Sequence, residues 1–288
     1  MTSYNNNNDK DNNCDDYSTS DESDDENYVS NWSKYIDLDD NEFGINHISE
    51  LMDITNVKEI HYKFQKLKSL PIGIFDNKIN LTVLDLSYNE LTELPDNIFS
   101  NNINLIKINL SDNKLKKLPK DVFKNNTKLW DLFLQRNSLE TLSADIFSYN
   151  INLRQLNMHS NCLETLDHNI FKNNEKLIMI YISRNKLKSL PPDIFSNNKE
   201  LLELYLQLNC LITLPASIFS NNPDLWELEL SGNKLEKLDE NIFDNNNQLY
   251  ILNLSNNNFK TIPKKIYNFV KIHNKRFGTS RLLSVPSL

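Results

Sequence analysis

Apolar residues recur along this chain at a fixed interval of 24 positions. Counted from the first residue of an interval, Leu, Ile or a similar residue stands at positions 1, 4, 6, 11 and 14, Asn stands at position 9, and Ile-Phe usually fills positions 18 and 19. Eight regular units open at Leu81, Leu105, Leu129, Leu153, Leu177, Leu201, Leu225 and Leu249, without insertion or deletion. A divergent unit opens at Val57, giving nine. A repeat of this period predicts a solenoid, because one unit cannot bury its apolar residues alone.

The first residues of each unit predict a short parallel strand. In the unit that opens at Leu105, Ile108 and Leu110 are expected to point inward, because they alternate with the polar residues Lys107, Asn109 and Ser111. Positions 3, 5, 7 and 8 therefore form an outward-facing surface that the fold does not dictate. The second half of each unit runs from Pro, or its replacement, into a predicted turn of helix or 3₁₀ that ends in Ile-Phe.

Two further columns of identical residues have predicted structural roles. The amide at position 9 can donate and accept, so stacked copies can bond to backbone groups of neighbouring loops. This predicted asparagine ladder consists of Asn89, Asn113, Asn137, Asn161, Asn185, Asn209, Asn233 and Asn257. The Phe residues at position 19, from Phe75 to Phe243, predict a stacked spine that Tyr267 continues. Since the chain has only four glycines, the Asn pairs after each Phe, such as Asn101 and Asn102, are expected to supply left-handed turns.

The pattern L-x-x-L-x-L-x-x-N-x-L-x-x-L-P-x-x-I-F, as in residues 201–219, resembles the typical 24-residue class of the leucine-rich repeat family. The resemblance covers about residues 57–267. It implies an α/β fold, namely a right-handed solenoid with a concave parallel β-sheet and short helical or 3₁₀ turns on the convex side, and it implies protein binding on the concave face. The sequence departs from the class at position 22, where Asn replaces the usual Leu, so we expect a looser convex half. The wealth of Asn, Lys and Ile resembles repeat proteins of amoebae or of the giant DNA viruses that infect them.

Charge and composition divide the chain into four segments. Residues 1–30 are Asn-, Asp- and Ser-rich with almost no aliphatic residues, which predicts a disordered acidic tail. Residues 31–56 regain apolar residues and are expected to cap the first unit, or alternatively to recruit an adaptor protein. The nine-unit array follows over 57–267, and a basic cap or tail spans 268–288. Residues 1–56 carry fifteen acidic and two basic residues, whereas the remainder carries 24 acidic and 29 basic ones.

Candidate chemistry is sparse. The five histidines occupy unrelated repeat positions, and no Cys-x-x-Cys, His-Glu-x-x-His or glycine-rich phosphate loop occurs, so we expect no enzyme, no metal site and no cofactor. Glu203 beside Glu227 and Glu229 is interpreted as a solvated acidic patch rather than an acid–base pair. Cys162 and Cys210 lie two units apart, about 10 Å, too far for a disulfide. No apolar signal region or membrane-spanning stretch is found, which favours the cytoplasm, or the host-cell cytoplasm if the protein is viral. Separately, we expect the chain to be a monomer.

The outward positions predict a contact surface. Position 5 would be polar if it were only solvated, yet three of the middle five residues there are aromatic. Aromatic and Arg side chains with a charged rim are typical of binding hot spots, although β-propensity alone also places aromatic residues on strands. The predicted partner-binding residues are Phe133, Arg136, Met179, Tyr181, Arg184, Tyr205, Leu208, Glu203 and Glu227.

The leading functional hypothesis is a non-enzymatic scaffold that binds an unidentified protein partner on the concave sheet face. A small-molecule substrate is not expected. One alternative is a substrate-receptor subunit of a ubiquitin-ligase complex, with residues 31–56 recruiting the ligase. Another is a binder of nucleic acid or an anionic surface through the basic C-terminal tail, which the modest net charge of the array makes less favoured.

Overall fold

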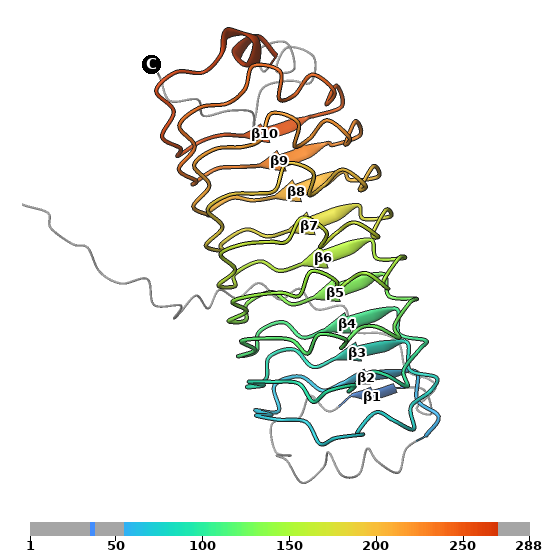
Figure 1. Ribbon diagram of the computed structural model, residues 1–288. Coiled ribbons are helices and arrows are strands. Elements are labelled where there is room, and N and C mark those ends of the chain that lie inside the picture. Colours follow the sequence, from blue (N-terminus) through green and yellow to red (C-terminus); the bar gives the residue numbers. More distant parts are fainter. Residues whose placement is uncertain (1–34, 38–54, 270–288) are drawn as a thin grey trace, which may run out of the picture. The chain divides into compact units, whose positions relative to one another are not determined.

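The array is built around one parallel sheet whose strands follow the order of the sequence (Figure 1). A computed structural model describes residues 35–37 and 55–269; the predicted tail 1–30, most of the predicted cap 31–56 and residues 270–288 of the predicted basic tail lie outside them. Ten strands of three residues each form the sheet: β1 (Tyr35–Asp37), β2 (Glu59–His61), β3 (Val83–Asp85), β4 (Lys107–Asn109), β5 (Asp131–Phe133), β6 (Gln155–Asn157), β7 (Met179–Tyr181), β8 (Glu203–Tyr205), β9 (Glu227–Glu229) and β10 (Ile251–Asn253).

The 24-residue period becomes the register of the sheet. Each residue pairs with the one 24 positions later, so Leu156 lies opposite Ile180 and Gln155 opposite Met179. From β2 to β10 the middle residue of every strand is at most 1% exposed, while the first residue is partly exposed. Each buried aliphatic side chain stabilises the fold by about 1.5–3 kcal/mol. The predicted solenoid and its parallel sheet are confirmed, including the inward and outward assignment of strand residues.

The asparagines at position 9 connect neighbouring units through both ends of the amide. Asn161 donates from Nδ2 to the carbonyl oxygens of Leu134 (3.0 Å) and Met158 (3.1 Å). Its Oδ1 accepts from the backbone N–H of Leu139 (3.0 Å). The same bonds recur along the column, so that backbone groups facing the core between units are paired.

A second asparagine ladder lies on the side opposite the sheet, at position 22. Asn174 is fully buried and donates to the carbonyl oxygens of Phe147 and Asn150, both at 2.9 Å. The expectation that Asn at this position loosens this side is therefore wrong, because each amide connects its unit to the one before. The ladder members are Asn102, Asn126, Asn150, Asn174, Asn198, Asn222 and Asn246. Their Oδ1 atoms have no hydrogen-bond partner among the described residues.

The second half of each unit consists of successive turns with i→i+3 hydrogen bonds, which is the bonding of a 3₁₀ turn. In one unit the Asn174 N–H donates to Phe171 O (3.1 Å), and the Leu177 N–H donates to Asn174 O (3.1 Å). Only the last described stretch, residues 264–269, is α-helical. The phenylalanine spine stacks with ring centroids 6.0–6.5 Å apart from Phe75 to Phe195. Its continuation is Phe269, whose ring stacks on Phe243, and not Tyr267, which is exposed.

Left-handed backbone recurs at position 8, with further cases at Lys66, Gly73 and Asn97. It does not occur in the Asn pairs that follow each Phe, so that prediction is wrong. In all nine units the residue before position 9 has positive φ: Phe64, Tyr88, Asp112, Arg136, Ser160, Arg184, Leu208, Gly232 and Asn256. The backbone N–H of this residue donates to the next unit, as Arg184 does to Gln207 O (2.9 Å). The inter-unit bonds thus impose the left-handed backbone conformation on residues of every type. This costs about 1–2 kcal/mol for each residue that is not Gly, Asn or Asp.

Candidate binding surface

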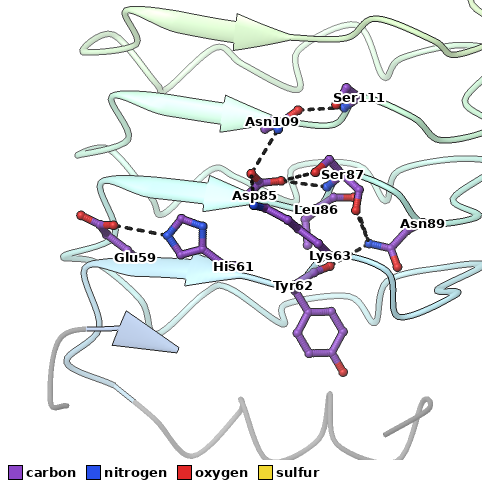
Figure 2. Close-up of polar contacts among 10 residues, drawn as sticks. All are labelled: Glu59, His61, Tyr62, Lys63, Asp85, Leu86, Ser87, Asn89, Asn109 and Ser111. Atoms are coloured by element: carbon purple, nitrogen blue, oxygen red, sulfur yellow. Dashed lines mark hydrogen bonds and ion pairs between the residues drawn. The ribbon is translucent and has the colours of Figure 1, made fainter. Parts of the chain in front are cut away.

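The outward face of the sheet differs in chemistry from one end to the other. Near its start the polar side chains bond to one another (Figure 2). Asp85 of β3 is only 6% exposed and accepts from the backbone N–H and the hydroxyl of Ser87 (3.0 and 2.6 Å) and from Asn109 Nδ2 (3.1 Å). Lys63 Nζ lies 3.8 Å from the same carboxylate, and His61 Nε2 lies 3.3 Å from Glu59. Asp85 therefore has a lysine beside it, and Glu59 has a histidine.

The centre of the face pairs opposite charges. Lys107 of β4 lies opposite Asp131 of β5, and its Nζ is 5.2 Å from the ring centroid of Phe133. Burial raises the pKa of Asp131, while Lys107 and Arg154 lower it. Arg136 Nη1 lies 3.3 Å from Asp112 Oδ1. On this part of the sheet, Asp131 and Asp112 thus each have a basic side chain on a neighbouring unit.

His159 and Ser183 occupy position 7 of adjacent units, and His159 Nδ1 lies 2.5 Å from Ser183 Oγ. Burial, together with Arg184 and Arg136, lowers the pKa of His159 to about 4. An imidazole with this pKa is a weak base, and the charged groups that act on it are both guanidinium groups rather than an orienting carboxylate. Ser183 itself is 2% exposed. The pair therefore lacks what an activated serine nucleophile needs.

Two tyrosines and a glutamate form a compact cluster on β7 and β8. The rings of Tyr181 and Tyr205 stack with centroids 4.6 Å apart and planes 8° apart. Both hydroxyls donate to Glu203 Oε2, at 3.1 and 3.3 Å, and the Tyr181 hydroxyl also lies 3.5 Å from Met179 Sδ. Burial and the charges of Glu203 and Glu227 raise the pKa of Tyr181 to about 12. The pKa of Tyr205 is raised further, by burial first and then by the nearby carboxylates of Glu227 and Glu203.

Carboxylates adjoin this cluster on β9. Glu203 lies directly opposite Glu227, and Tyr205 lies opposite Glu229. Burial first, and then the neighbouring charge of Glu227, raise the pKa of Glu229, whereas hydrogen bonds from Asn253 and Ser231 lower it. The predicted solvated acidic patch is thus a partly buried arrangement in which like charges face each other across two strands.

The sequence interpretation missed a column of exposed apolar side chains at position 2, just before each strand. Trp226 and Tyr250 stack with centroids 4.5 Å apart, and the guanidinium carbon of Arg154 lies 4.8 Å from the ring centroid of Trp130. Leu202 is 40% exposed in the same column. The signal was present in the alignment of the repeats, because position 2 holds Trp130, Ile178, Leu202, Trp226 and Tyr250 where a solvated position would be polar.

The structure brings together some of the predicted partner-binding residues and separates others. Met179, Tyr181, Glu203, Tyr205 and Glu227 lie on the neighbouring strands β7–β9. Phe133 lies two strands away from Tyr181, and Arg136 forms an ion pair with Asp112. Arg184 and Leu208 are exposed at the left-handed position 8, and Leu208 Cδ2 lies over the α-carbon of Gly232, 2.6 Å from where a β-carbon would stand.

Within residues 55–269, no group of three or more His, Cys, Asp and Glu side chains is placed to hold a metal ion. Neither Cys162 nor Cys210 forms a disulfide within this part of the chain. None of the helices among the described residues has the length and hydropathy needed to cross a membrane.

The fold and this face define a parallel-sheet solenoid of 24-residue units with two asparagine ladders. Leucine-rich repeat family models match residues 79–139, 131–187, 175–235 and 248–269, which together cover more than half of the chain. The chain therefore belongs to the leucine-rich repeat family, as the sequence pattern predicted. Repeats of this family generally mediate protein–protein interaction. A search among curated proteins finds no match.

Solved structures of the same fold span several contexts. A leucine-rich repeat protein of Leptospira interrogans matches with a TM-score of 0.73 and 28% identity, over 83% of this chain and 58% of that one. TLR13, solved in complex with ssRNA13, matches with a TM-score of 0.63 and 26% identity, over 74% of this chain and 34% of that one. Drosophila Toll, in its glycosylated complex with Spatzle, matches with a TM-score of 0.68 and 25% identity, over 82% and 34%. The chain spans less than two-thirds of the length of each.

Proposed function

We propose that this chain is a non-enzymatic interaction module that binds a protein partner on the outward face of its sheet, centred on β7–β9. The observation that carries the proposal is the stacked pair of Tyr181 and Tyr205 on a surface where the fold requires no aromatic residue. Their partly buried rings, the exposed stack of Trp226 on Tyr250 and the surrounding charges have the composition of a binding hot spot.

Structural likeness alone does not choose the kind of partner, since one neighbour was solved with RNA and another with Spatzle. The chemistry of the face favours protein. Phosphate groups would meet Glu203, Glu227 and Glu229 beside the tyrosines, and the same negative charges would repel them. The Ser183–His159 pair lacks the properties of a catalytic pair, which supports a binding role rather than an enzymatic one.

Replacing both tyrosines tests the proposal. Tyr181→Ala with Tyr205→Ala should lower recovery of the partner by about tenfold or more in affinity purification from the native host cell, followed by mass spectrometry. The melting temperature should change little, because the backbone of β7 and β8 is held by bonds that these side chains do not make.

The chain supplies a matched control. Phe64 and Tyr88 form another exposed stacked pair on the same face, with centroids 4.5 Å apart. Phe64→Ala with Tyr88→Ala removes the same kind of surface from the far end of the array and should leave recovery unchanged. Undiminished recovery with the Tyr181 and Tyr205 variant, or equal losses from both double variants, would refute the placement of the partner.

A further inference from the structure

We infer that the segment of the partner that docks on β7–β9 is basic, and that its Lys or Arg side chains are received by Glu203, Glu227 and Glu229. This inference rests on the proposed function and adds the chemical class of the partner. It follows from the arrangement of charge on these strands, which differs from that on the rest of the sheet face.

The first observation is the register of like charges. Glu203 and Glu227 are directly opposed across β8 and β9, and Glu229 is two residues further along β9. Like charges that face each other across neighbouring strands destabilise a sheet, whereas opposite charges such as Lys107 and Asp131 stabilise it. A cation placed between the two opposed carboxylates would convert the repulsion into attraction on both sides.

The second observation is that neutral groups surround two of these carboxylates. Among residues 55–269, no side chain forms an ion pair with Glu203 or Glu229. Glu203 accepts from the Tyr181 and Tyr205 hydroxyls, and Glu229 accepts from Asn253 and Ser231. These bonds orient the carboxylates but leave their negative charge in place.

The third observation is that the site is built before a ligand arrives. The two tyrosine hydroxyls fix Glu203, and the stacked rings fix each other. Glu229 is partly buried, so a charge pair made there is screened less than one on the open surface. The rings of Trp226 and Tyr250 stand at position 2 of their units, just before β9 and β10. They offer apolar faces to the methylene stems of Lys or Arg and π-faces to their charged ends.

The same geometry argues against other cationic ligands. The three glutamates are not placed to hold a metal ion, since no such group occurs among the described side chains. A protein segment with several Lys or Arg residues can instead contact carboxylates on two strands and the aromatic stack at once. Charge complementarity therefore favours a basic polypeptide as the occupant.

The test measures binding of a fluorescein-labelled nona-arginine peptide to the full chain by fluorescence anisotropy, with nona-glutamate as the negative probe. The variant Glu203→Gln, Glu227→Gln, Glu229→Gln should weaken nona-arginine binding by about tenfold, because three charge pairs are lost. The control Glu93→Gln, Glu140→Gln, Glu175→Gln removes the same charge from exposed sites outside the strands and should change the affinity less than twofold. Equal weakening by both triple variants would overturn the inference, because the probe would then respond to net charge alone.

Capture of the native partner separates this inference from the proposed function. The patch triple variant is Glu203→Gln, Glu227→Gln, Glu229→Gln. If this variant and the Tyr181→Ala, Tyr205→Ala variant both lose the partner, the proposed function and the basic-segment inference are both supported. A partner lost by the tyrosine variant and fully retained by the patch triple variant would overturn the basic-segment inference and leave the proposed function standing. Self-association of the wild-type chain that the patch triple variant abolishes, measured by light scattering, would also overturn it, because the occupant would be a second copy.

Discussion

Carboxylates at the two ends of one sheet face are used in opposite ways. On β2–β4, Asp85 is nearly buried, accepts three hydrogen bonds and has Lys63 beside it (Figure 2). On β8 and β9, Glu203 and Glu227 oppose each other, and the groups that bond to Glu203 are neutral. The first arrangement fixes loops and leaves little charge for a ligand. The second lowers stability slightly and keeps charge available, which is the pattern expected of a binding surface.

The largest expected contrast comes from deleting one carboxylate at the same repeat position in each region. Asp85→Ala leaves the buried Ser87 N–H and hydroxyl without their acceptor and should lower the free energy of unfolding by about 2–3 kcal/mol. Glu229→Ala removes a carboxylate whose pKa burial has raised, so it should change the free energy little. Urea unfolding followed by circular dichroism measures both. Similar losses from the two variants would show that the regions do not differ.

Reversing one charge should change the free energy of unfolding by a smaller amount, with opposite signs for the like-charged pair Glu203–Glu227 and the oppositely charged pair Lys107–Asp131. Glu227→Lys places a cation opposite Glu203 and should raise the free energy of unfolding by about 0.5 kcal/mol, whereas Lys107→Glu opposite Asp131 should lower it by a similar amount. Calorimetric melting of both variants checks the signs. Glu227→Gln serves as the control that separates relief of repulsion from new attraction. If Glu227→Lys destabilises the protein, the two glutamates are not in conflict.

The smallest effect is a pH dependence located at Glu229. Its pKa in the folded state is raised, chiefly by burial, so the folded protein holds that proton more readily than the unfolded chain does. The ionised carboxylate therefore disfavours folding at neutral pH, and this penalty disappears as the pH falls toward the pKa of the unfolded chain. Glu229→Gln should be more stable than the wild type at pH 7.5, and the difference should shrink by pH 4.5. A difference that does not vary with pH would contradict the assignment.

Much of the fold could be predicted from the sequence because its signals are local and repeated. Alternation at positions 3 to 6 assigned each inward Leu or Ile, and a constant period required neighbouring strands to stay in register. The amide ladder at position 22 was misjudged, because Asn174 bonds to the carbonyl of Phe147, 27 residues earlier, and nothing in the local pattern reveals that partner. The left-handed residues were misplaced for a related reason. Inter-unit hydrogen bonds impose positive φ on Arg184 and Leu208, which carry no sequence signature of it.

The candidate site was partly predictable. Tyr181 and Tyr205 stand at position 5 of adjacent units, and Glu203 stands at position 3 of the second of these units. Their proximity therefore followed from the register of the sheet. The apolar column at position 2 was missed, because alternation within a strand says nothing about the residue before it. The interactions that give the patch its character are three-dimensional: two hydroxyls share one oxygen of Glu203, and Glu229 is partly buried. Their effects on pKa could not be obtained from residue types alone.

The unbroken 24-residue spacing has a consequence for how such a protein can change its length. A deletion or duplication of one whole unit, for example residues 153–176, joins chain ends that already occupy equivalent places, so both asparagine ladders and the phenylalanine spine remain continuous. What changes is the separation between Arg136, which precedes the altered unit, and the glutamates of β8 and β9, which follow it, by about 4.8 Å for each unit. Whole units can therefore be added or removed to change the distance between two surface features, while the contacts that hold the scaffold together stay the same.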